Sequence, residues 1–185
     1  MNVSPRARNG FDYYVAQAAK NSLAANAAEC AVCPADEPVA PEQELVMLTV
    51  TTYGFRVVVF IHFNRDLSTR AHFASLAGQP VEAMDEVLFN DTMMERGNLF
   101  CGAFNRDLTP FFPHTGMSTP CVLARTSMEH VDHLHPAYTA CYRAELAPGV
   151  VLHVTLAVCA FGDVDFEFEP RAADEVDTAG ELEMF

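Results

Sequence analysis

The longest apolar run of the chain, residues 149–162, limits the folds that this sequence can adopt. His153 and Thr155 interrupt the run, which falls short of the roughly 20 apolar residues that a membrane-spanning helix needs. Its content of Val and Leu instead indicates a strand buried in a sheet. The polar, basic residues 1–10 also lack the apolar core of a signal peptide. The sequence therefore predicts a cytoplasmic protein built around a sheet.

Composition and charge limit the partners of this protein. Half of the 185 residues are apolar and 19% are charged, which predicts one folded domain with a sizeable core. The formal net charge is -14, and the nine acidic residues and Arg171 that follow from Asp163 onward account for -8 of it. Nucleic-acid binding and binding to an anionic membrane surface both need a basic face, so neither is expected.

Turn and periodicity signals predict an α+β domain, a largely antiparallel sheet with helices packed on one face. We expect a flexible N-terminus (1–10), a folded domain (11–169) and an acidic C-terminal tail (170–185). Residues 33–42, with three prolines, are expected to form a connector. The expected helices are 11–28, a short one from Asp66 or Ser68 to about residue 76, and 81–106. The expected strands are 45–52 and 55–63 in a hairpin, 119–124, 138–146 and 150–161.

The long predicted helix carries the most informative pattern. At about 100° per residue, Asp91, Glu95 and Asn98 lie within roughly 60° of one another, and Gly102 falls in the same sector. Four apolar residues lie opposite them: Phe89, Met93, Phe100 and Phe104. One side of the helix can therefore pack on the sheet while the other displays an acid and an amide. Gly102 on that side leaves room for another surface to approach. A solvated helix face that merely carries polar residues is the alternative.

The spacing of these residues resembles the signature of the CheC/CheX/FliY family of chemotaxis phosphatases. Three residues separate Asp91 from Glu95, two separate Glu95 from Asn98, and twenty-one separate Asn98 from Pro120. The predicted order of elements is also similar, and the single copy of the motif resembles CheX-like members. Arg96-Gly97 inside the motif and the aromatic segment 111–114 before Pro120 depart from the family pattern, and they leave partner choice and activity open.

The resemblance implies an activity and a role for each motif residue. The family accelerates hydrolysis of the aspartyl phosphate on a CheY-like response-regulator receiver domain. Asn98 would orient the attacking water and Glu95 would dock against a basic residue of the receiver, while Asp91 and Pro120 would shape the helix and the adjoining strand. Mg²⁺ would belong to the receiver, so no cofactor of this chain's own is expected. CheX-like relatives also imply a homodimer.

Two other hypotheses remain open, and they concern different classes of function. A non-catalytic module could dock a receiver or a flagellar-switch component through the same helix face. A metal-binding regulator could use the cluster His130, His133 and His135, although a loop before Pro136 favours simple solvent exposure. Cys30 and Cys33 lack a second pair at zinc-ribbon spacing. Because no export signal is found, we expect all six cysteines to be free thiols in a reducing cytoplasm.

Overall fold

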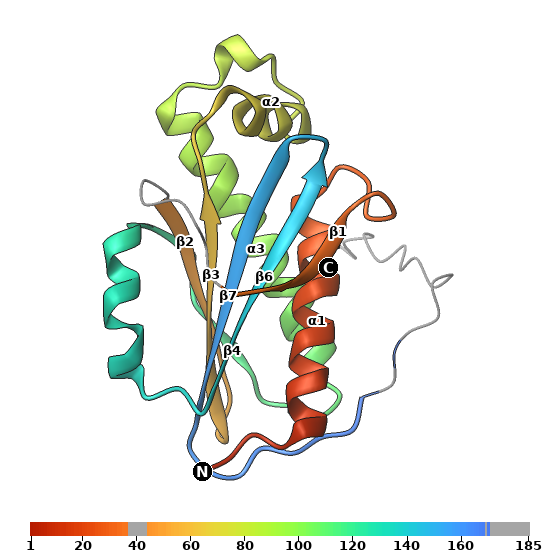
Figure 1. Ribbon diagram of the computed structural model, residues 1–185, viewed down its shortest axis with the longest axis vertical. Helices are drawn as coiled ribbons and strands as arrows, with labels where there is room; N and C mark the ends of the chain where they lie inside the picture. The colour runs from red at the N-terminus through yellow and green to blue at the C-terminus, as the bar shows by residue number, and fades with distance from the viewer. Residues whose placement is uncertain (37–43, 169, 171–185) are drawn as a thin grey trace, which may run out of the picture.

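The computed structural model describes residues 1–36, 44–168 and 170 of the chain. These residues form three α-helices, two 3₁₀ helices and a seven-stranded sheet (Figure 1). The elements in chain order are α1 Pro5–Leu23, β1 Ala31–Ala35, β2 Glu44–Thr51, β3 Phe55–Phe63, α2 Leu67–Leu76, η1 Val81–Ala83, α3 Glu86–Leu108, β4 Gly116–Met117, β5 Cys121–Ala124, η2 Arg125–Leu134, β6 Tyr138–Ala147 and β7 Val150–Ala160.

All strand pairs within the sheet are antiparallel, in the order β1-β6-β7-β3-β2-β4, with β5 also paired to β2. The apolar run forms β7, which lies between β6 and β3 and is buried along most of its length. Its inner side chains Leu152, Val154 and Leu156 are fully buried in the main core. The predicted α+β class and antiparallel sheet are confirmed.

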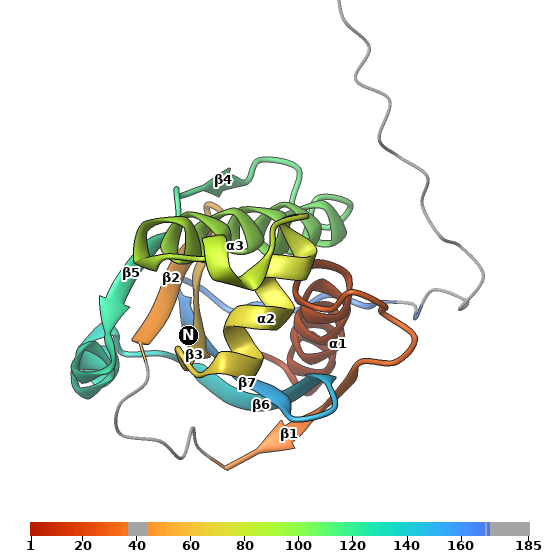
Figure 2. The same cartoon turned by 90° about the horizontal axis from the view of Figure 1, so that it is seen from above.

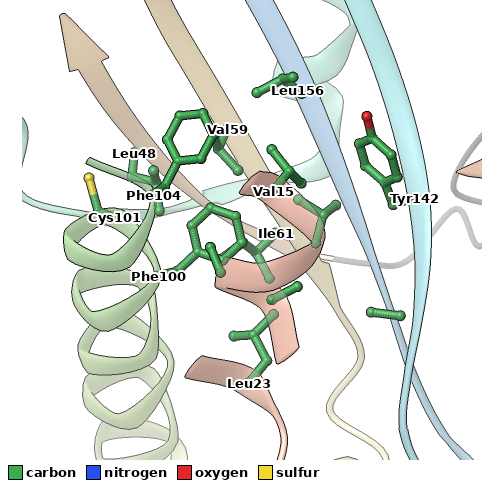
Figure 3. Close-up of a cluster of buried hydrophobic side chains, with 14 of the residues drawn as sticks. Val15, Leu23, Leu48, Val59, Ile61, Phe100, Cys101, Phe104, Tyr142 and Leu156 are labelled. Atoms are coloured by element: carbon green, nitrogen blue, oxygen red, sulfur yellow. The ribbon is translucent and has the colours of Figure 1, made fainter. Parts of the chain in front are cut away.

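The three α-helices pack on one face of the curved sheet (Figure 2). Between them and the sheet lies the main core, in which Phe100 and Phe104 of α3 and Val15 of α1 meet sheet residues such as Ile61 (Figure 3). Burial of such side chains contributes roughly 1.5–3 kcal/mol each. On the opposite face, η2 covers a smaller cluster through Val131. This layer was not predicted, because residues 129–135 were expected to form a loop.

The β2–β3 hairpin and the short helix α2 match their predictions. Thr52 Oγ1 accepts hydrogen bonds from the backbone N–H groups of Gly54 and Phe55, at 3.0 and 3.2 Å, which closes the turn. Asp66 caps α2 by accepting a 2.8 Å hydrogen bond from the backbone N–H of Thr69. The turn before β7 also forms as expected, with Gly149 at a φ of 80° that other residues seldom adopt.

The prediction of a flexible segment 1–10 and a helix 11–28 is wrong at both ends of α1. The helix begins at Pro5, because Ser4 caps it by accepting a hydrogen bond from the Ala7 N–H and proline fits the first helical position. It ends at Leu23. The side chain of Asn26 then accepts a hydrogen bond from the Ala28 N–H, a local bond that competes with helix formation.

Two further boundaries differ from the predictions. Residues 33–35, the start of the expected connector 33–42, belong to β1, and Pro34 is tolerated there because β1 is an edge strand that pairs with β6. The connector from residue 37 onward lies outside the described residues. The predicted helix 81–106 is interrupted after η1. Asp85 caps α3 by accepting a 2.8 Å hydrogen bond from the Leu88 N–H, so the α-helix begins at Glu86.

The two ends of the folded domain are joined to each other. Val3 is fully buried and forms a parallel bridge with Val164, and the two segments run side by side in Figure 1. Next to it, Phe166 packs edge-on against Phe11 with ring centroids 5.2 Å apart. Apart from Pro170, the predicted acidic tail 170–185 lies outside the described residues. Within the described ranges, no helix is long and apolar enough to cross a membrane.

Candidate functional site

The exposed side of α3 brings the predicted motif residues together. Asp91, Glu95 and Asn98 are exposed on it and Gly102 is partly exposed. We call these four residues the motif face. The apolar residues predicted opposite to it, Phe89, Met93, Phe100 and Phe104, are at most 1% exposed. The predicted amphipathic helix is confirmed.

Two arginines near α2 fix the first half of α3. Arg65 donates a 2.8 Å hydrogen bond to the Asn90 side chain and also pairs with Glu44. Arg70 donates a 3.0 Å hydrogen bond to the Met84 carbonyl, just before α3 begins. Both guanidinium groups lie over the ring of Phe89, within 5.5 Å of its centroid. These contacts set the helix at a defined position on the sheet, so the motif face rests on a rigid support.

Arg96 lies inside the motif but points away from the motif face. Its Nη2 donates a 2.8 Å hydrogen bond to the carbonyl of Leu76, the last residue of α2. A carbonyl at a helix C-terminus is a favourable partner for a cation. This departure from the family pattern therefore ties α3 to α2 and adds no positive charge beside Glu95.

Gly97 and Pro120 meet on the sheet side of α3. A Cβ atom at position 97 would lie 3.3 Å from the Cβ and Cγ atoms of the buried Pro120 ring and 2.9 Å from Val46 Cγ1. Only glycine fits such a close approach without displacing its neighbours. The second departure, Gly97, thus lets α3 pack closely against β2 and the residue before β5.

The polar groups of the motif face are free to meet another molecule. Among the residues that the structure describes, Glu95 forms no ion pair and the side chain of Asn98 forms no hydrogen bond. A Cβ atom at Gly102 would meet nothing within 4 Å. The arrangement offers a carboxylate and a neutral amide about one helical turn apart, beside open space.

The other candidate residues do not form a comparable site. The rings of His130 and His133 stack on η2 with centroids 5.7 Å apart, and His135 follows in a left-handed conformation. Within the described ranges, no three His, Cys, Asp or Glu residues are grouped so that they could hold a metal ion. Cys30 is buried, Cys33 is exposed, and all six cysteines are free thiols.

The comparisons with known proteins give structural matches at low sequence identity. No family model matches the chain, and no curated protein matches it either. Chemotaxis protein CheX from Vibrio vulnificus is 13% identical with a TM-score of 0.56, over 81% of this chain and 97% of that one. CheX of Borrelia burgdorferi, solved in a complex with CheY, BeF₃ and Mg²⁺, is 12% identical with a TM-score of 0.57, over 82% and 96%. This chain has a CheX-like fold.

A third match supports the same fold. A CheC-like superfamily protein from Shewanella sp. PV-4 is 12% identical with a TM-score of 0.51, and the match covers 84% of this chain and 98% of that one. Each match spans almost the whole solved protein, so the CheX-like fold accounts for most of the described domain. Within it, α3 lies on the same face of the sheet as α1 and α2 (Figure 2), and its exposed residues form the motif face.

Residues outside the predicted motif add an apolar character to this side of the CheX-like fold. Val87 and Leu99 of α3 are 70% and 46% exposed, and Met117 of β4 is 55% exposed. Helical periodicity predicts that Val87 and Leu99 lie near the motif face, since Val87 lies one turn before Asp91 and Leu99 one turn after Glu95. Met117 could not be found in this way, because its position depends on the pairing of β4 with β2.

Proposed function

We propose that this protein is a phosphatase that accelerates hydrolysis of the aspartyl phosphate on a CheY-like receiver domain. One observation supports it most: Glu95 and Asn98 stand together, exposed and unpaired among the described residues, on a rigid helix of a CheX-like fold. The CheX of Borrelia burgdorferi was solved with CheY, which supports a receiver as the partner. The proposal places the reaction in the cytoplasm, where such receivers act.

In the proposed reaction, Asn98 acts on the nucleophile. Its amide both donates and accepts hydrogen bonds while remaining neutral, so it can hold a water molecule in line with phosphorus without changing the local charge. The water attacks phosphorus, the bond between phosphorus and the receiver's aspartate oxygen breaks, and inorganic phosphate leaves. Catalysis of this kind depends on positioning rather than on a covalent intermediate with this chain.

Glu95 has a docking role in this proposal. Its carboxylate would pair with a basic residue beside the phosphorylation site of the receiver and hold the two surfaces in register. The receiver is expected to carry the Mg²⁺ that neutralises charge on the phosphoryl oxygens. The motif face then needs no metal ligands of its own. We further propose a homodimer, on the likeness to CheX proteins alone.

The test is a dephosphorylation assay. A CheY-like receiver is phosphorylated with a small phosphodonor, and loss of the phosphoryl group is followed with and without this protein. We expect catalytic acceleration by the wild type and none by the Glu95→Ala/Asn98→Ala variant. A wild type that accelerates nothing, or a variant with full activity, would contradict the proposal. Complex formation without acceleration would instead support the non-catalytic docking module.

A further inference from the structure

Three exposed apolar side chains surround the motif face. Leu99 lies one helical turn beyond Glu95, and Val87 lies one turn before Asp91. Met117 pairs directly with Val50, whose side chain is buried in the core under the helices. Directly paired residues point to the same face of a sheet, so Met117 lies on the helix side, where β4 runs beside α3 (Figure 2).

The size of this surface suits a protein partner. Val87 and Leu99 are twelve positions apart in one helix, which corresponds to about 18 Å along its axis. Met117 widens the surface on the side of β4. Exposed apolar residues scattered singly need no explanation, but three of them around a pair of unpaired polar groups indicate a binding surface.

The charge of the surface selects the chemistry of that partner. Asp91 and Glu95 are exposed on the motif face, about one helical turn apart. Arg96 is directed to the Leu76 carbonyl, while Arg106 adds an exposed positive charge near the end of the helix. The side of α3 around Glu95 is thus acidic with apolar residues at its margins, and it complements a partner with a basic centre and an apolar surround.

We propose that Val87, Leu99 and Met117 determine which receiver domain this protein binds, by contacting apolar side chains around the receiver's basic docking residue. The identity of the partner class rests on the proposed function. Glu95 and Asn98 serve any receiver, because every receiver presents the same phosphorylation chemistry. The three apolar residues provide the contacts that differ between receivers, and truncation of an interface side chain that carries binding energy weakens binding on the order of tenfold.

Binding to beryllofluoride-loaded CheY-like receivers tests this inference without depending on catalysis. For the receiver bound most tightly by the wild type, we expect Leu99→Ser, Val87→Ser and Met117→Ser each to raise Kd about tenfold, with an unchanged dependence on salt. Phe161→Ser is the matched control, since Phe161 is 51% exposed and directly follows β7, which β3 and β2 separate from β4. It should bind as the wild type does. Unchanged thermal unfolding would show that each variant is folded.

Kinetics separate docking from chemistry. With the same receiver in phosphorylated form, the apolar variants should raise KM about tenfold and leave kcat within about twofold, whereas Asn98→Ala should lower kcat. Apolar variants that bind like the wild type, or a wild type that binds no loaded receiver, would overturn the inference. If the wild type binds and the apolar variants bind more weakly, but no dephosphorylation occurs, the inference holds and the phosphatase proposal fails.

Discussion

Gly97 and Pro120, twenty-three positions apart in the sequence, are in contact across the junction between α3 and the sheet. A Cβ atom at position 97 would come within 3.3 Å of the proline ring and 2.9 Å of Val46. The contact links two parts of the motif that the sequence presents separately. It fixes the height of α3 above β2, and with it the position of Glu95 and Asn98.

Replacing Gly97 and Gly102 by alanine should change stability in opposite directions. Alanine favours a helix interior by up to about 1 kcal/mol over glycine, but at position 97 overpacking against Val46 and Pro120 costs about 1–3 kcal/mol. We expect Gly97→Ala to lower the free energy of unfolding by about 1 kcal/mol. Gly102→Ala should raise it by about 0.5–1 kcal/mol, because nothing lies within 4 Å. Urea unfolding of both variants measures this, and equal stabilisation would contradict the contact.

The motif face could be predicted from the sequence, because the positions of its residues depend on helical periodicity alone. Four phenylalanine and methionine positions determine which side of α3 is buried, and Glu95 and Asn98 follow on the other side. The contact of Gly97 with Pro120 could not be predicted in this way. It depends on the register of β5 against β2 and on the packing of α3 over both.

The errors at element boundaries have different causes. Ser4-Pro5 is a recognisable start of a helix, so the sequence itself contains the signal for the early start of α1. Asp85 likewise marked the true start of α3. The strand β1 carried no such signal, since it is short and contains Pro34. It forms because β6 offers a free edge, which only the complete sheet provides.

Asn98 and Glu95 should affect different kinetic constants. If Asn98 positions the water, Asn98→Ala should lower kcat by about 10²-fold and change KM little, as loss of a single transition-state contact does. Asn98→Asp keeps the shape but adds charge and should be equally impaired. Glu95→Gln should mainly raise KM. It should also make KM less dependent on salt, because the residue at position 95 no longer forms an ion pair with the basic residue of the receiver. Glu129→Gln, an exposed acid on η2, is the control.

Phe166 should contribute to stability although it lies beyond the last strand. It is 7% exposed, and its ring packs edge-on against both Phe11 and Phe112. Truncation of a buried phenylalanine costs about 3–5 kcal/mol, so Phe166→Ala should lower the free energy of unfolding by about 3 kcal/mol. Phe161→Ala, at 51% exposure, should cost less than about 1 kcal/mol. Similar losses for the two variants, measured by urea unfolding, would contradict this account.

Stability should fall as the pH drops below 6.5, because of a buried histidine on the sheet face opposite the α-helices. His62 is fully buried and its Nε2 lies 3.0 Å from Thr155 Oγ1. Burial, together with the positive charges of His153 and Arg125, lowers the pKa of His62 to about 4. Burial also lowers the pKa of His153, its direct neighbour across β3 and β7, and Arg143 adds to this effect.

In the unfolded chain these histidines take up protons near pH 6.5, whereas folded His62 does so only near pH 4. Above pH 6.5 His62 is neutral in both the folded and the unfolded chain, so its contribution to stability is fully present. Between pH 6.5 and 4 the unfolded state binds the extra proton, so the free energy of unfolding should fall by about 3 kcal/mol from His62 alone.

His62→Gln keeps a polar group near Thr155 and removes the titration. Urea unfolding at a series of pH values should therefore give a shallower slope for this variant between pH 6.5 and 4 than for the wild type. His114→Gln, at an exposed position, should retain the wild-type slope. Carboxylates titrate in all three proteins, so the difference between the curves isolates His62. A His62→Gln curve parallel to that of the wild type would show that His62 is protonated equally well in the folded and unfolded states.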